Sequence, residues 1–250
     1  MNRQLRPTSI RTTGIVIGLA FLLHGCATPV ASSGPVSDSP QEAAAAYTRL
    51  GKAYLAENNP LRAQQALEHA LRIDAGESEA LEGLALLYQG QGELDLAETF
   101  FERALRAEPD ATRIRNNYAA LLFQRQQFTL ACQQLERASQ DITYTNRAQL
   151  FANLGQCEIA RGDTVAAERH YQRALDIDPR SARSLLALAN IDHTQGNNEQ
   201  AWERLQRYFT VAGTSDDSLR LASDIASAQG DTSRAAFYRQ QLDGAQANRP

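Results

Sequence analysis

The sequence predicts an all-α protein, a right-handed superhelical solenoid of six helix pairs. Three observations lead to this fold class. Alanine, leucine, glutamine, glutamate and arginine dominate the composition, and these residues favour helices. After Pro40 the sequence repeats with a period of about 34 residues, the length of one helix pair. Short turn sequences with glycine or asparagine separate the helices within pairs, and no segment needs a β-strand.

The first 25 residues have the layout of a secretory signal peptide. Arg3, Arg6 and Arg11 precede an apolar stretch at residues 15–23, and no acidic residue accompanies them. The apolar stretch has about ten residues, whereas a membrane-spanning helix needs roughly 20. A transmembrane anchor is therefore a weak alternative.

The cysteine after this stretch predicts a lipid anchor. The segment Leu23-His24-Gly25-Cys26 resembles a lipobox, in which signal peptidase II cuts before the cysteine and the thiol receives a diacylglycerol. Several acyl chains, at roughly 0.8 kcal/mol per buried methylene, hold a protein on a membrane. The alternative is an ordinary secretory signal with an incidental cysteine, because His24 replaces the usual small residue. Ala27 stands where an aspartate would signal inner-membrane retention, so we expect the periplasmic face of a Gram-negative outer membrane.

Residues 26–40 form a short polar segment interrupted by proline, which we interpret as a flexible tether before the solenoid at 41–250. Removal of residues 1–25 changes the formal net charge from −4 to −7, because three arginines and no acidic residue are lost. This balance does not support nucleic-acid binding, which favours a basic surface.

One alanine near the start of each second helix marks the repeat. Consecutive markers lie 34 or 36 residues apart, and they are Ala63, Ala97, Ala131, Ala167, Ala201 and Ala235. The surrounding residues follow the tetratricopeptide repeat (TPR) pattern. Large residues such as Phe101 and Tyr171 fill the space between pairs, and Pro109 and Pro179 end second helices. Small residues are expected where the helices of a pair cross closely, at Gly51, Ala85, Ala119, Gly155 and Ala189.

The turns within the pairs are also marked in the sequence. Their turn-forming residues include Asn58, Gly92, Gly162, Gly196 and Gly230. The sixth pair follows the pattern least well, at Ala222, Ser223 and Leu242.

Cys132 and Cys157 leave two interpretations open. They are predicted on adjacent antiparallel helices of the third and fourth pairs, about equally far from a turn near Tyr144, so they could lie opposite one another. A disulfide is then expected in an oxidising periplasm, since Cys26 is committed to lipid. The alternative is that both are small apolar residues buried between helices. No metal site is expected, because no histidine is suitably spaced to complete a ligand set.

No catalytic motif accompanies the repeats. The chain lacks a glycine-rich phosphate loop, a paired histidine–glutamate zinc motif and a nucleophile elbow. Carboxylates alternate with arginines, as in Glu98, Glu102 and Arg103, which is typical of a solvated helix surface. We therefore expect neither enzymatic activity nor a cofactor.

Protein binding is the remaining class of function. In a TPR solenoid the first helices line a groove, where side chains not used in packing contact a partner. These positions are Thr48, Lys52, Glu79, Glu82, Leu86, Arg113, Asn116, Phe123, Gln149, Gln156, Arg183 and Asn190. Asn116 and Asn117 are poor helix formers. Either they bind the backbone of an extended peptide, or they make an inter-helix hydrogen bond or cap a helix start.

These features together resemble the PilF/PilW family of type IV pilus biogenesis and stability lipoproteins. A lipobox, a tether and six repeats fill the chain as they fill members of that family. The segment Asn116-Asn117-Tyr118-Ala119, with the turn at 126–128, looks like the family's third repeat, and residues 151–157 look like its fourth. Phe123 stands where family members often carry a cysteine.

The resemblance implies a pilotin-like role. Such a protein binds a pilus secretin subunit or another pilus assembly protein, and it promotes secretin multimerisation in the outer membrane or stabilises assembled pili. Joining a lipid anchor to a binding groove raises the partner's local concentration at the membrane. We expect the groove of the first three pairs to make the contact. The alternative is a TPR lipoprotein scaffold for outer-membrane protein assembly or cell-wall synthesis, with the same anchor and solenoid.

Overall fold

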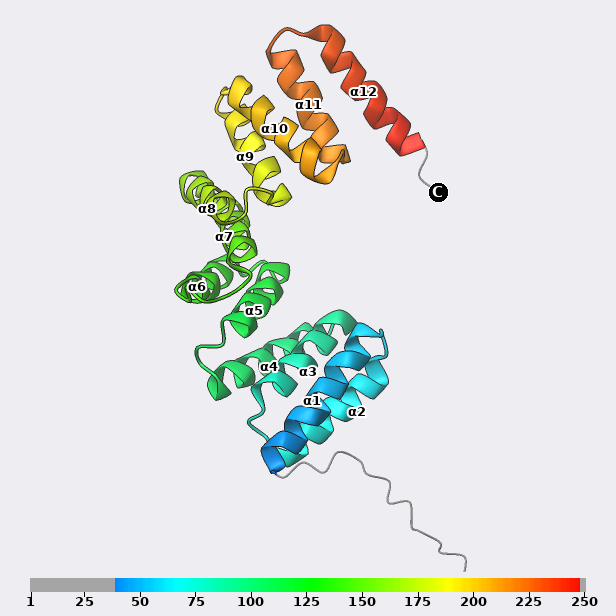
Figure 1. Ribbon diagram of the computed structural model, residues 1–250, viewed down its shortest axis with the longest axis vertical. Helices are drawn as coiled ribbons and strands as arrows, with labels where there is room; N and C mark the ends of the chain where they lie inside the picture. Colours follow the sequence, from blue (N-terminus) through cyan, green and yellow to red (C-terminus); the bar gives the residue numbers. More distant parts are fainter. Residues whose placement is uncertain (1–38, 248–250) are drawn as a thin grey trace, which may run out of the picture. The chain divides into compact units, whose positions relative to one another are not determined.

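The computed structural model describes residues 39–247, and within them every regular element is a helix (Figure 1). The predicted six helix pairs are confirmed. Their helices are α1 (Pro40–Ala56), α2 (Pro60–Ile73), α3 (Ser78–Gln91), α4 (Leu94–Ala107), α5 (Thr112–Gln124), α6 (Phe128–Ser139), α7 (Arg147–Arg161), α8 (Thr164–Ile177), α9 (Ala182–Thr194), α10 (Asn198–Ala212), α11 (Asp216–Ala228) and α12 (Thr232–Ala247). The expected signal peptide, the Cys26 lipidation site and most of the tether lie outside the described residues.

Local sequence signals explain where several helices begin and end. The Ser39 hydroxyl oxygen accepts a hydrogen bond from the Glu42 amide, and proline follows at the first helical position of α1. Asn59 caps α2 in the same way. Four of the turns inside pairs use a glycine with positive φ, at Gly92, Gly162, Gly196 and Gly230.

Two glycines let the helices of a pair cross closely, as predicted. A methyl group on Gly51 in α1 would lie 2.5 Å from Cγ of Leu67 in α2. A methyl group on Gly155 in α7 would lie 2.8 Å from the Tyr171 ring in α8. Alanine is buried at the equivalent first-helix positions of other pairs, including Ala85.

The core runs between neighbouring pairs, because each pair buries its apolar face against the next. Phe101 in α4 is completely buried, and its ring stacks on that of Tyr118 in α5 with centroids 5.6 Å apart. A smaller cluster around Leu67 and Leu84 joins the first pair to the second. Fully burying one leucine or phenylalanine side chain contributes about 1.5–3 kcal/mol.

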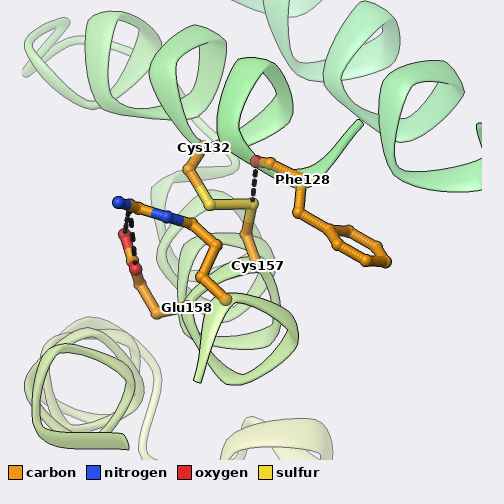
Figure 2. The surroundings of a disulfide bond; sticks show 5 residues. Phe128, Cys132, Cys157 and Glu158 are labelled. Atoms are coloured by element: carbon orange, nitrogen blue, oxygen red, sulfur yellow. Dashed lines mark hydrogen bonds and ion pairs between the residues drawn. A yellow bond between two sulfur atoms is a disulfide. The ribbon is translucent and has the colours of Figure 1, made fainter. Parts of the chain in front are cut away.

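A disulfide joins the third and fourth pairs. Figure 2 shows Cys132 of α6 bonded to Cys157 of α7, with the two Cα atoms 5.7 Å apart. Both cysteines are fully buried, and Sγ of Cys157 lies 3.3 Å from the carbonyl oxygen of Phe128. Of the two interpretations left open by the sequence, the structure shows the disulfide.

No helix within residues 39–247 combines the length and the apolar character needed to cross a bilayer.

Candidate protein-binding groove

First helices of the later pairs line two adjoining cavities. The smaller, of about 340 Å³, lies over α5 and α7, and the larger, of about 740 Å³, lies over α7, α9 and α11. Gln156 and Arg183 line both cavities, so the two form one continuous surface. We call it the α5–α11 groove, lined chiefly by residues 116–123, 149–159, 183–193 and 217–224. Its volume lies in the range of protein ligand sites.

A chain of side-chain hydrogen bonds connects three helices of this groove. Asn153 in α7 donates from Nδ2 to Oδ1 of Asn116 in α5, at 2.9 Å. Arg183 in α9 donates from Nη1 to Oδ1 of Asn153 at 2.6 Å and to Oε1 of Gln156 at 3.5 Å. Asn116 therefore makes the inter-helix hydrogen bond that the sequence left as one alternative, and it also lines the smaller cavity.

A second network, of charged groups, ties together the first three pairs. Lys52 Nζ in α1 lies 3.0 Å from Glu79 Oε2 in α3, and Arg113 Nη2 in α5 lies 2.9 Å from Glu79 Oε1. The other terminal nitrogen of Arg113 pairs with Glu82. The hydrogen bond from Lys52, with the charges of Lys52 and Arg113, holds the pKa of the Glu79 carboxyl below its usual value.

Two of the predicted contact residues are buried instead. Thr48 is 1% exposed, and its hydroxyl donates to the carbonyl oxygen of Ala44 at 2.9 Å. Glu82 is also 1% exposed, because Arg113 and Asn117 cover and satisfy its carboxylate. Their prediction as partner contacts is wrong: the repeat pattern gives the helix face but not the depth of the side chain.

Of the first three pairs, which we expected to make the contact, only the third lines the two cavities. Lys52, Glu79 and Arg113 form ion pairs with one another across α1, α3 and α5, whereas the two cavities lie over α5 to α11. Leu86 is 38% exposed on α3 but does not line either cavity.

Five other predicted positions do line the α5–α11 groove. Phe123 and Gln149 border the smaller cavity, and Asn190 borders the larger. Gln156 and Arg183 border both. The ring of Phe123 packs edge-on against that of Phe128, with centroids 5.0 Å apart. The groove thus presents both polar and apolar side chains, as suits an extended polypeptide.

Sequence reasoning missed the contribution of the sixth pair. Asp217, Arg220 and Asp224 of α11 also line the larger cavity. The sequence did contain a signal for these positions, because Asp217 and Asp224 follow the predicted groove residues Arg183 and Asn190 by one 34-residue period. The weak repeat pattern around Ser223 obscured this register.

Family models identify the class of protein that this fold and groove define. One tetratricopeptide repeat model matches residues 110–180, and another matches residues 54–121 and 158–212. The protein is a TPR protein, with an all-α superhelical fold.

Similarity to individual proteins shows where this chain falls within the TPR class. The type IV pilus assembly protein PilF of Pseudomonas aeruginosa is 29% identical over 229 residues, which cover 91% of each chain. The solved structure of Pseudomonas aeruginosa PilF superimposes with a TM-score of 0.78 at 28% identity, over 84% of this chain and 95% of that one. PilW, described as a widely conserved type IV pilus biogenesis factor, gives 0.74 at 26% identity, over 82% and 94%. The chain therefore belongs to the PilF/PilW-like family of TPR proteins, as the sequence predicted.

Similarity also extends to a protein whose name carries no pilus designation. Cellulose synthase 1 operon protein C of Komagataeibacter xylinus is 28% identical over 179 residues, covering 66% of this chain. The match spans only 13% of that protein's length, so it is a likeness between repeat regions.

Proposed function

We propose that this protein is a lipid-anchored binding protein of type IV pilus biogenesis, acting at the periplasmic face of the outer membrane. The observation that carries the proposal is the extent of the similarity to Pseudomonas aeruginosa PilF, which covers 91% of both chains rather than a few repeats. The chain contributes binding and has no catalytic role.

The proposed partner is a subunit of the pilus secretin, or another pilus assembly protein. The α5–α11 groove holds an extended segment of this partner, and the acyl chains on Cys26 hold the complex on the membrane. Confinement to one surface raises the effective concentration of secretin subunits, which favours their multimerisation without any further contact.

Deletion of the gene tests this proposal directly. We expect fewer surface pili, weaker twitching motility and less secretin multimer in the outer membrane, with recovery on expression of the wild-type chain. As a control, the deletion strain is also complemented with the Arg173→Gln variant. Recovery should match that with the wild-type chain, because Arg173 is exposed on α8 and does not line the groove. Normal secretin multimers and normal motility in the deletion strain would contradict the proposal.

The second candidate is a scaffold for outer-membrane protein assembly or cell-wall synthesis. The repeat similarity to a cellulose synthase operon protein favours it, since that relative carries no pilus designation. A pull-down with the full chain distinguishes the two: recovery of secretin supports the pilus role, and recovery of barrel-assembly or wall-synthesis proteins without secretin supports the scaffold.

A further inference from the structure

Two arginines at equivalent repeat positions have different surroundings. Arg113 and Arg183 are each the second residue of a first helix, in α5 and α9. Glu79 and Glu82, which precede Arg113 by 34 and 31 residues, both form ion pairs with it. Arg113 is thus neutralised by acidic residues of the preceding pair.

The preceding pair offers Arg183 no such neutralisation. The residues 34 and 31 positions before it are Gln149 and Ala152, which carry no charge. Its guanidinium is held instead by the neutral amide oxygens of Asn153 and Gln156. Within residues 39–247, no carboxylate forms an ion pair with Arg183.

Two acidic residues of α11, Asp217 and Asp224, line the larger cavity with Arg183, and neither forms an ion pair with it. Asp217, one period after Arg183, instead has its Oδ1 3.3 Å from Nη1 of Arg220. The side chain of Arg183 is exposed and lines both cavities, so its remaining donors are accessible from the groove. A guanidinium fixed by amides in this way is oriented for a carboxylate, which it binds through two parallel hydrogen bonds.

The position of Arg183 also indicates how a ligand would run. Because Arg183 lines both cavities, a chain that occupies them passes over the guanidinium and continues on either side. Asn116 lines the smaller cavity and Asn190 the larger, and their amide groups suit the peptide backbone of an extended segment. An acidic side chain within a chain fits this arrangement, whereas a chain terminus would leave one cavity empty.

We infer that the α5–α11 groove binds an extended segment of a partner protein that presents an internal aspartate or glutamate to Arg183. The inference rests on the proposed function and deepens it, since it gives the partner's segment a defined chemistry. Arg183 selects the acidic residue, and the groove amides bind the backbone around it.

Selection from a displayed peptide library tests the inference. The full chain, purified in detergent, is immobilised and presented with random 12-residue peptides held between constant flanking sequences, so that no chain terminus is free. We expect the selected peptides to carry aspartate or glutamate at one fixed position. Arg183→Gln should abolish this preference, whereas Arg173→Gln, which alters an exposed arginine outside the groove, should retain it.

Affinity measurements on one selected peptide complete the test. Replacing its acidic residue by glutamine should weaken binding to the wild-type chain by about tenfold, as expected for loss of a charged hydrogen-bonded pair. The same replacement should have little effect on binding to Arg183→Gln, and thermal unfolding monitored by circular dichroism should show that the variant remains folded.

Several outcomes would overturn the inference: no enriched peptides, enrichment without an acidic position, or the same acidic preference in Arg183→Gln. Binding confined to peptides with a free terminal carboxylate would also overturn it. Failure of the proposed function would give a different combination of results. An acidic preference that depends on Arg183, together with normal secretin multimers in the deletion strain, would support the groove chemistry and refute the secretin role.

Discussion

The side chain of Asn117 in α5 donates from Nδ2 to the buried carboxylate of Glu82 in α3, at 2.8 Å. This contact explains an asparagine in the middle of a helix, where its intrinsic propensity is unfavourable. A buried carboxylate is costly unless it is paired and hydrogen-bonded, and Glu82 has both the Arg113 ion pair and the Asn117 amide. Asn117 thus serves the packing of the second pair on the third.

Replacing Asn117 should therefore destabilise the fold. Asn117→Ala leaves one oxygen of Glu82 without its hydrogen bond, and we expect the free energy of unfolding to fall by about 1–3 kcal/mol. Urea denaturation followed by circular dichroism measures the change. Asn190→Ala, which alters an exposed asparagine, is the control and should change stability by no more than about 0.5 kcal/mol. Equal losses in the two variants would contradict this account.

A methyl group added at Gly155 should be far more harmful than one added at Gly90. In Gly155→Ala the new Cβ would lie 2.8 Å from the Tyr171 ring, so the buried ring or the two helices of the fourth pair must shift. We expect a loss of about 1–3 kcal/mol from overpacking. Gly90→Ala in α3 meets nothing within 4 Å and should stabilise the protein by up to about 1 kcal/mol through helix propensity. The comparison uses thermal and urea unfolding, and a neutral Gly155→Ala would refute the close crossing.

Loss of the disulfide should lower stability without changing the number of helices. The bond closes a segment of 25 residues between Cys132 and Cys157, and removal of such a cross-link costs about 3 kcal/mol in the chain-entropy model. We expect the Cys132→Ala, Cys157→Ala double variant to unfold at lower urea with an unchanged far-ultraviolet spectrum. Mass spectrometry of the alkylated wild-type chain provides the control, since two free thiols there would show that the bond is absent.

Acid should weaken the network around Glu79. Its pKa is lowered in the folded state by Lys52 and Arg113, so the stabilisation is complete above the usual value of 4.5 and is lost as pH falls through the folded pKa. Glu79→Gln should remove this part of the pH dependence between pH 5 and pH 3.

Glu77 should have the opposite effect on stability, because burial and neighbouring acidic groups raise the pKa of its carboxyl. Glu77→Gln should therefore increase stability at pH 7, and chemical denaturation across pH tests both variants.

Cys26→Ser should abolish lipidation. The lipobox prediction places the acyl chains on the thiol of Cys26, and a serine hydroxyl cannot replace it as the acceptor. We expect the variant to incorporate no fatty-acid analogue and to leave the membrane fraction. Cys132→Ala, which leaves Cys26 intact, should still be labelled. Labelling of the Cys26→Ser chain would show that the anchor lies elsewhere.

Most of the fold could be predicted because its signals are local and repeated. The alanine markers, the turn glycines and the small residues at Gly51 and Gly155 each report one crossing of two helices. The opposition of Cys132 and Cys157 followed from their equal distance from one turn. These relationships depend on spacing alone.

The depth and pairing of groove residues were harder to predict. Thr48 and Glu82 lie on the expected face but beneath their neighbours, because burial depends on side chains contributed by the adjacent pair. The contrast between Arg113 and Arg183 depends on which side chains of the preceding pair reach each guanidinium: carboxylates for Arg113 and amide oxygens for Arg183. A single sequence shows which residues recur, but not which of them reach one another.

The cross-link between α6 and α7 bears on how the protein would respond to pulling. If the chain is tethered through Cys26, as proposed, a pull on α9 and α11 is transmitted to the tether through the third and fourth pairs. The covalent bond between Cys132 and Cys157 then carries this tension past the connection between those pairs. The long connection between the third and fourth pairs therefore cannot be drawn out as slack while the disulfide is intact.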